Sequence, residues 1–107
     1  MEIQDWPEDV ILVKLPGEPQ MANELIAVTE KVRDRGDCDV VIDFSGVDIV
    51  TSSSLSKLLK LRKKLSDSGH KLVLCSVSAA TKGIFMITGL DGNFEFVEDK
   101  SEVLASL

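Results

Sequence analysis

Four consecutive hydroxyl residues stand where an apolar strand-like segment gives way to a leucine-rich segment with helical spacing. They are Thr51, Ser52, Ser53 and Ser54, called the hydroxyl cluster below. The first N–H groups of a helix lack partners within the helix and form the positive end of its dipole, so a phosphate is stabilised there. Helix capping by Thr51 or Ser52 explains one hydroxyl. A serine that accepts a phosphate at this place indicates a switch rather than a catalyst.

The remaining residues do not support a catalytic or metal-binding arrangement. The chain contains neither GxxxxGK[ST] nor GxGxxG, and its only histidine, His70, follows the predicted helix at its far end. A helix of about 15 residues spans about 22 Å, so His70 cannot act as a base for Ser52. Asp43 and Asp48 are the one carboxylate pair to consider, and Asp43 more simply accepts backbone N–H groups near the end of a strand. We therefore expect no enzyme, no catalytic residue, no metal and no cofactor, although a pocket for a nucleotide or a lipid stays open.

Composition narrows the class of protein further. The chain has 107 residues and a formal net charge of −6, which suits one domain and argues against nucleic acid as a partner. It has no run of about 18 apolar residues and no signal-peptide pattern at Met1, so we expect a cytoplasmic protein without a membrane span. Cys38 and Cys75 are far apart in sequence, and we expect both to be reduced.

Charge is distributed unevenly along the chain. Residues 1–50 contain twelve acidic and four basic residues, whereas residues 57–64 contain five basic residues and no acid. A basic helix on an acidic domain can steer a charged partner, or it can simply be a solvated outer face.

The hydrophobic pattern predicts alternating strands and helices. We expect strands at 2–6, 10–15, 39–44, 71–75 and 94–97, and helices at 21–35, 53–68, 78–88 and 100–107. This order predicts an α/β fold with a four- to five-stranded, mostly parallel sheet, an antiparallel N-terminal edge and about four flanking helices. The hydroxyl cluster follows the central strand, at the carboxyl edge where functional loops gather in such sheets.

Three segments carry a family resemblance. Residues 15–18 read LPGE, residues 41–55 read VIDFSGVDIVTSSSL, and residues 74–90 read LCSVSAATKGIFMITGL. In this order and spacing they resemble STAS-domain proteins, whose motifs are L-x-G-E, VLDLSGVxFIDSSGL and a strand-to-helix stretch ending in TGL. The chain is most similar to the stand-alone anti-sigma factor antagonists of bacteria, and the resemblance implies one STAS domain over residues 1–107.

The resemblance implies a partner switch that regulates transcription. In the family, an anti-sigma factor that is also a serine kinase binds the unphosphorylated antagonist through the loop and helix after the central strand. Phosphorylation of the serine that matches Ser52 releases it, and a serine phosphatase reverses the step. Thr51 and Ser53 are alternative acceptors, and we expect a monomer. The implied partner-binding residues are Gly17, Glu18, Ser45, Val47, Thr51, Ser52, Ser53, Ser54, Lys57 and Lys60.

Three positions depart from the family pattern. Thr51 replaces the usual aspartate before the serine pair, Ser54 replaces the glycine after it, and Gln20 replaces an acid beyond the Gly-Glu turn. These changes leave a second interpretation open, namely a STAS scaffold or accessory subunit of a signalling or transport complex without phosphate control.

Overall fold

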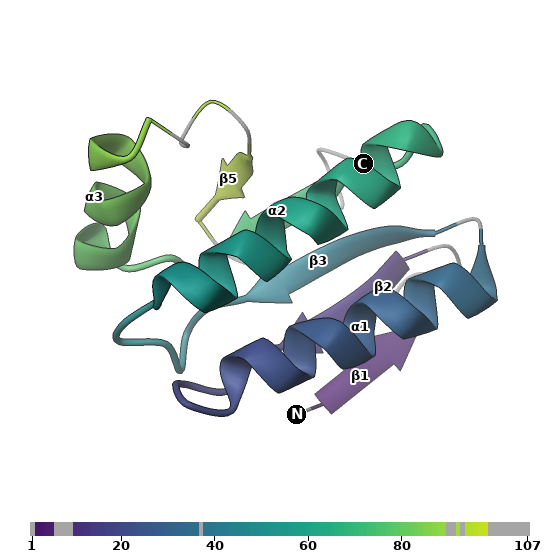
Figure 1. Cartoon of the computed structure of the whole chain (residues 1–107), viewed down its shortest axis with the longest axis horizontal. Helices are drawn as coiled ribbons and strands as arrows, with labels where there is room; N and C mark the ends of the chain where they lie inside the picture. The colour runs from purple at the N-terminus through teal and green to yellow at the C-terminus, as the bar shows by residue number, and fades with distance from the viewer. Residues whose placement is uncertain (1, 6–9, 37, 90–91, 93, 99–107) are drawn as a thin grey trace.

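Five strands form one sheet, in which their spatial order follows their order in the chain (Figure 1). The computed structural model describes residues 2–5, 10–36, 38–89, 92 and 94–98, with the backbone alone for residues 2–5. The strands are β1 (Glu2–Asp5), β2 (Val10–Lys14), β3 (Asp39–Asp43), β4 (Leu72–Cys75) and β5 (Glu95–Val97). β1 pairs with β2 in antiparallel fashion, and the other neighbours are parallel. The predicted sheet with an antiparallel N-terminal edge is thus confirmed.

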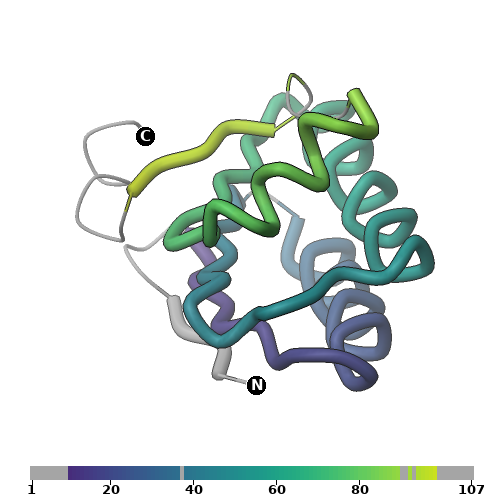
Figure 2. Tube along the Cα trace, turned by 90° about the vertical axis from the view of Figure 1, so that its left-hand side faces the viewer, coloured from purple at the N-terminus to yellow at the C-terminus, as the bar shows by residue number. Residues whose placement is uncertain are grey.

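Helices connect the successive parallel strands. They are α1 (Met21–Arg35), α2 (Ser52–Asp67) and α3 (Ala79–Ile87). Because each right-handed crossover steps in the same direction along the sheet, the connecting helices belong on one face. Figures 1 and 2 show α1 and α2 side by side there. The predicted helix at 100–107 lies outside the described residues, among which no helix has the length and apolar character needed to cross a bilayer.

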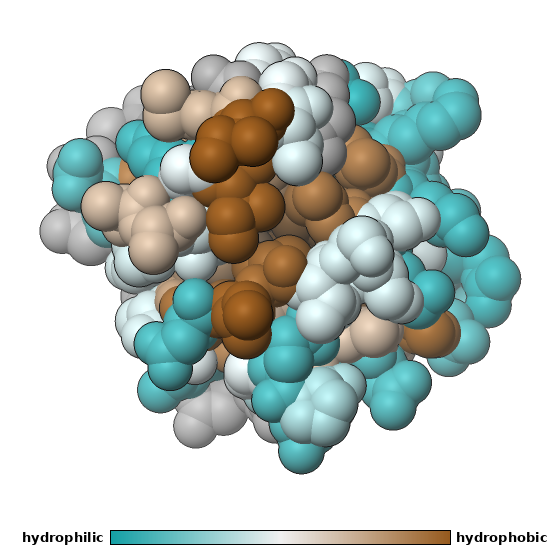
Figure 3. Space-filling model, turned by 60° about the vertical axis from the view of Figure 1, so that its left-hand side comes forward, coloured by the Kyte–Doolittle hydropathy of each residue, from teal (hydrophilic) through white to brown (hydrophobic). Residues whose placement is uncertain are grey.

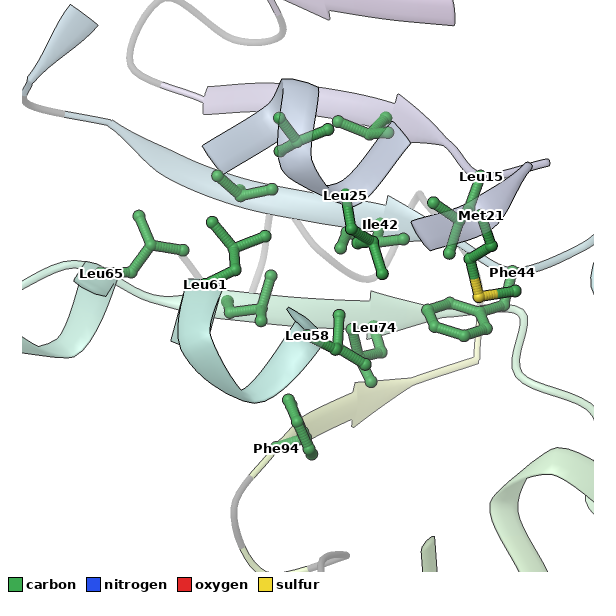
Figure 4. Packing of buried hydrophobic residues seen from close by; sticks show 14 of the residues in the cluster. Leu15, Met21, Leu25, Ile42, Phe44, Leu58, Leu61, Leu65, Leu74 and Phe94 are labelled. Carbon is green, nitrogen blue, oxygen red and sulfur yellow. The ribbon is translucent and has the colours of Figure 1, made fainter. Parts of the chain in front are cut away.

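The main core lies between this face of the sheet and the helices (Figure 4). Alternate residues of β3, such as Ile42, meet the buried stripes of α1 and α2, where Leu25 and Leu61 are fully buried. The opposite face carries a smaller buried cluster that includes Val41 and Val73. β3 is therefore buried on both faces, as its uninterrupted apolar pattern predicts.

α3 corrects one prediction about the core. The apolar pattern of residues 78–88 suggests that Ile84, Phe85 and Ile87 all face inward. Phe85 is buried, and its ring centroid lies 5.3 Å from that of Phe94, but Ile87 is 88% exposed. Residues two positions apart lie about 200° apart around a helix, so Ile87 cannot share the inward face of Phe85.

Candidate functional site

The hydroxyl cluster forms the start of α2 at the carboxyl edge of the sheet. Thr51 is the N-cap, with extended backbone angles, and its Oγ1 accepts a hydrogen bond of 3.2 Å from the N–H of Ser54. Ser52, Ser53 and Ser54 then make the first turn of the helix. Of the two predicted caps, the structure selects Thr51.

The buried carboxylate of Asp43 starts the loop that leads to this cap. Its Oδ1 accepts a hydrogen bond of 2.8 Å from the N–H of Ser45. The backbone N–H of Phe44 still bonds to the carbonyl of Cys75 in β4, so the loop leaves the sheet only after this residue. Asp43 therefore has the structural role that its position predicts.

Glu18 reaches across from the loop between β2 and α1 to the start of α2. Its Oε2 accepts a hydrogen bond of 2.8 Å from the N–H of Thr51, 33 residues away in sequence. The two loops lie close together, since a Cβ on Gly17 would stand 3.7 Å from the carbonyl oxygen of Gly46. Glu18 thus ties the β2–α1 loop to the helix that carries the hydroxyl cluster.

These hydrogen bonds also set the ionisation of Glu18. Partial burial by itself would raise the pKa of its carboxyl group. The backbone N–H of Thr51 and the hydroxyls of Ser54 and Thr51 outweigh this effect, so the pKa of Glu18 lies below its ordinary value of 4.5. One backbone N–H at the start of α2 therefore already holds a carboxylate, which the local sequence pattern does not reveal.

Burial divides the hydroxyl cluster into two parts. Thr51, Ser52 and Ser53 are exposed, whereas Ser54 is fully buried, and its Oγ accepts a hydrogen bond of 3.2 Å from the Thr51 hydroxyl. Ser54 is in helical register with Leu58, and both face the sheet. The hydroxyls of Ser52 and Ser53 form no hydrogen bond with any residue that the structure describes.

Most of the other expected partner-binding residues lie at or near this edge. Ser45 is exposed and Gly17 and Glu18 are half-buried, but Val47 is only 3% exposed. The side chains of Val47 and Ser54 point into the core, so they do not reach the surface on which we expected them.

The two expected lysines lie further along α2. Lys57 and Lys60 line a groove between α1 and α2 rather than the tip of the helix. They follow Ser53 at helical spacings of four and seven residues, so they continue its side of the helix.

Large apolar side chains are exposed in the loop before α2 and at the end of α3. Figure 3 shows an apolar band on the face that lies at the left of Figure 1. The large exposed apolar side chains include Ile49 in the loop before α2, which is 60% exposed, and Met86 and Ile87 in the last turn of α3. Ile49 was not among the residues expected from the sequence. Its loop also contains the buried Val47 and Val50, so the apolar pattern alone does not show which of the three is exposed.

His70 lies at the opposite edge of the sheet from the hydroxyl cluster. Its Nδ1 stands 3.4 Å from Asp39 Oδ1 at the start of β3, and its backbone N–H bonds to the carbonyl of Leu65 at the end of α2. In the described part of the chain, no three His, Cys, Asp or Glu side chains come together as metal ligands.

Three solved structures show the same fold. An anti-sigma-factor antagonist (STAS) domain protein from Planctomyces limnophilus matches with a TM-score of 0.79 and 22% identity over 98% of this chain and 95% of that one. The phosphorylated form of the Bacillus cell fate determinant SpoIIAA gives a TM-score of 0.74 and 12% identity over 99% and 98% of the two chains. A sulfate transporter family protein from Wolinella succinogenes gives 0.79 and 18% identity over 94% and 85%.

The family itself is shown by sequence. The model of the STAS domain family matches residues 8–103, which include all four parallel strands, the three helices between them and the hydroxyl cluster. The protein therefore belongs to the STAS domain family.

Proposed function

We propose that this protein is an anti-sigma factor antagonist that acts by partner switching in the bacterial cytoplasm. In its unphosphorylated form it binds, as a monomer, an anti-sigma factor that has serine kinase activity. Phosphorylation of Ser52 releases the partner, and a serine phosphatase restores binding. The observation that carries the proposal is the exposed hydroxyl of Ser52, which makes no hydrogen bond with the described residues, in the first turn of α2.

The geometry favours Ser52 over its neighbours as the acceptor. The Thr51 hydroxyl caps α2, so its modification would remove the cap, and Ser54 is buried. Ser53 is exposed, but it precedes Lys57 by one helical turn, where a lysine could neutralise an added phosphate. Ser52 lies on the outer side of α2, two residues and about 200° from Ser54, so a phosphate there would change the surface most.

Charge explains why a phosphate would weaken binding. A phosphate group adds roughly −1.5 to −2 charges at neutral pH. Glu18 already occupies the N–H of Thr51, the residue next to Ser52, and Asp48 is exposed in the same loop. The added charge would therefore lie close to two carboxylates, and the partial positive charge of the helix start would offset only part of it. A partner that covers Ser52 would have to remove water from it without a compensating charge, which is unfavourable.

Comparison with known proteins supports the proposal at the level of the domain. SpoIIAA is known in a phosphorylated form, and its fold matches that of this chain over nearly their full lengths. A STAS domain can thus carry a phosphate and keep its fold, which a binding switch requires.

The second candidate function is a scaffold or accessory subunit without phosphate control. The match to a sulfate transporter family protein favours it, as do Thr51 and Ser54 in place of the family's aspartate and glycine. The Thr51 hydroxyl donates to that of Ser54, and both hydroxyls help to lower the pKa of Glu18, so the two replacements also have a structural explanation.

A kinase assay and a binding assay test the proposal together. The protein is incubated with ATP and the serine-kinase anti-sigma factor encoded beside its gene, and the phosphate is mapped by mass spectrometry. Calorimetry then compares the binding of Ser52→Ala and Ser52→Asp, with Ser66→Asp as a matched control. Ser66 is exposed on α2, about 20 Å from Ser52 along the helix, and this substitution adds the same charge.

We expect phosphate on Ser52, and binding that is weaker by about tenfold or more for Ser52→Asp but nearly unchanged for Ser66→Asp. Phosphate found only outside residues 51–54, or equal affinities of Ser52→Ala and Ser52→Asp, would contradict the proposed switch.

A further inference from the structure

Basic side chains form a row along the junction of α1 and α2. We call this row the basic seam; it consists of Arg33 on α1 and Lys57, Lys60 and Lys64 on α2. The three lysines recur at spacings of three and four residues, which places them on one side of the helix. That side faces α1, because residues of both helices line the same grooves.

Two grooves run along the seam. The larger, of about 250 Å³, has Ile26, Thr29, Glu30 and Arg33 on the α1 wall and Lys57 and Lys60 on the α2 wall. The smaller, of about 140 Å³, has Arg33 and Lys64 in its walls. Since Arg33 lines both, the two grooves are neighbours along the junction of the two helices.

The cations of the seam lack internal partners. Among the residues that the structure describes, none of Arg33, Lys57, Lys60 and Lys64 forms an ion pair. Lys63, on the outer side of α2, does form one with Asp67 at 3.4 Å. Four unpaired cations along these grooves, in a protein whose net charge is −6, concentrate a positive potential where an acidic ligand can approach.

We propose that the basic seam binds an acidic segment of a protein partner. Carboxylates of the segment pair with the four cations, and one apolar side chain of the segment packs on Ile26, which is 42% exposed in the larger groove. Lys57 and Lys60 also belong to the partner-binding residues expected from the sequence, so the seam extends that surface along α2, whereas Arg33 and Lys64 lie beyond it. The seam does not include Ser52, and binding of an acidic segment to it requires no phosphate.

The width of the seam favours a protein segment over a broad anionic surface. Exposed carboxylates lie beside the row, with Glu30 and Asp34 on α1 and Asp67 on α2. A membrane or a nucleic acid duplex would bring its phosphates against these acids as well. A single helix or extended chain in the grooves would meet only Glu30 among these acids, together with the four cations.

The test uses a synthetic peptide of about 15 residues, in which short groups of glutamates alternate with leucines; this is about the shortest length at which an isolated helix becomes possible. Fluorescence anisotropy measures its binding to the full chain, and amide chemical shifts locate it. Lys60→Glu is compared with Lys63→Glu. Both lysines are exposed on α2, three residues apart, and the two substitutions change the net charge equally.

We expect Lys60→Glu to weaken peptide binding about fivefold or more and Lys63→Glu to change it less than about twofold. Binding should also weaken as salt is added, because the charges are exposed. The largest changes in amide chemical shift should fall on residues of the basic seam. Equal losses in the two variants, or shifts outside the seam, would overturn the proposal, as would preferential binding to phosphatidylserine vesicles. No kinase or phosphate enters this assay, so its failure is distinct from failure of the switch at Ser52.

Discussion

Replacing Glu18 should loosen the connection between the β2–α1 loop and the start of α2. Hydrogen bonds to a buried charged group are each worth about 1.5–3 kcal/mol. Water competes for this half-buried carboxylate, so we expect Glu18→Ala to lower the free energy of unfolding by about 1 kcal/mol. Glu18→Gln keeps a neutral acceptor and should lose about half as much. For a domain of this size, 1 kcal/mol corresponds to roughly 4–8 °C in the melting temperature.

The loss should depend on pH in a defined direction. Because the pKa of Glu18 is lower in the folded protein than its ordinary value of 4.5, the unfolded chain binds more protons near that pH. The contribution of Glu18 to stability is therefore fully present above 4.5 and disappears as the pH falls through the lowered folded value. The stability difference between wild type and Glu18→Gln should follow the same course.

Urea unfolding followed by circular dichroism measures this difference from neutral pH down to about pH 3. Glu30→Gln is the control. Glu30 is exposed on α1, and its side-chain carboxylate makes no hydrogen bond with the described residues. A Glu18→Gln difference that stays constant over this pH range, or that matches the control throughout, would refute the reasoning about the carboxylate.

Two further predictions concern the residue that caps α2 and a residue with a positive φ at the end of β4. Thr51→Val should lower the free energy of unfolding by about 1 kcal/mol because it removes the cap of α2, whereas Thr51→Ser should retain the cap and most of the stability; chemical unfolding distinguishes the two. Ser76 has a φ of 57° at the end of β4, where glycine is less strained, so Ser76→Gly should raise stability by about 0.5–1 kcal/mol. Ser76→Ala should give no such gain in a thermal melt, and a gain of equal size would argue against relief of backbone strain.

The sheet and helices were predictable from sequence because local signals agree with the fold. The segment 21–35 was predicted as a helix that stops at Gly36, and α1 has these bounds, with Gly36 at a φ of 86°. β3 shows the same agreement, since its unbroken apolar run predicts burial on both faces, and only a strand in the middle of a covered sheet provides that.

The arrangement of the candidate site was only partly predictable. Spacing could have placed Ser54 inward, because it precedes Leu58 by one turn, but a run of four similar hydroxyls conceals this phase. The contact between Glu18 and Thr51 joins two loops 33 residues apart. No local pattern encodes such a contact, since it depends on how neighbouring strands bring their loops together.

The single direction of the crossovers has an electrostatic consequence. Each of the three helices follows the carboxyl end of a parallel strand, so α1, α2 and α3 all begin at the same rim of the domain. Each start contributes roughly half a positive elementary charge from its peptide dipoles. The backbone thus offsets part of the negative side-chain charge that collects there from Glu18, Asp43 and Asp48. An anion added at this rim should therefore alter what the domain binds while leaving its folding nearly unaffected.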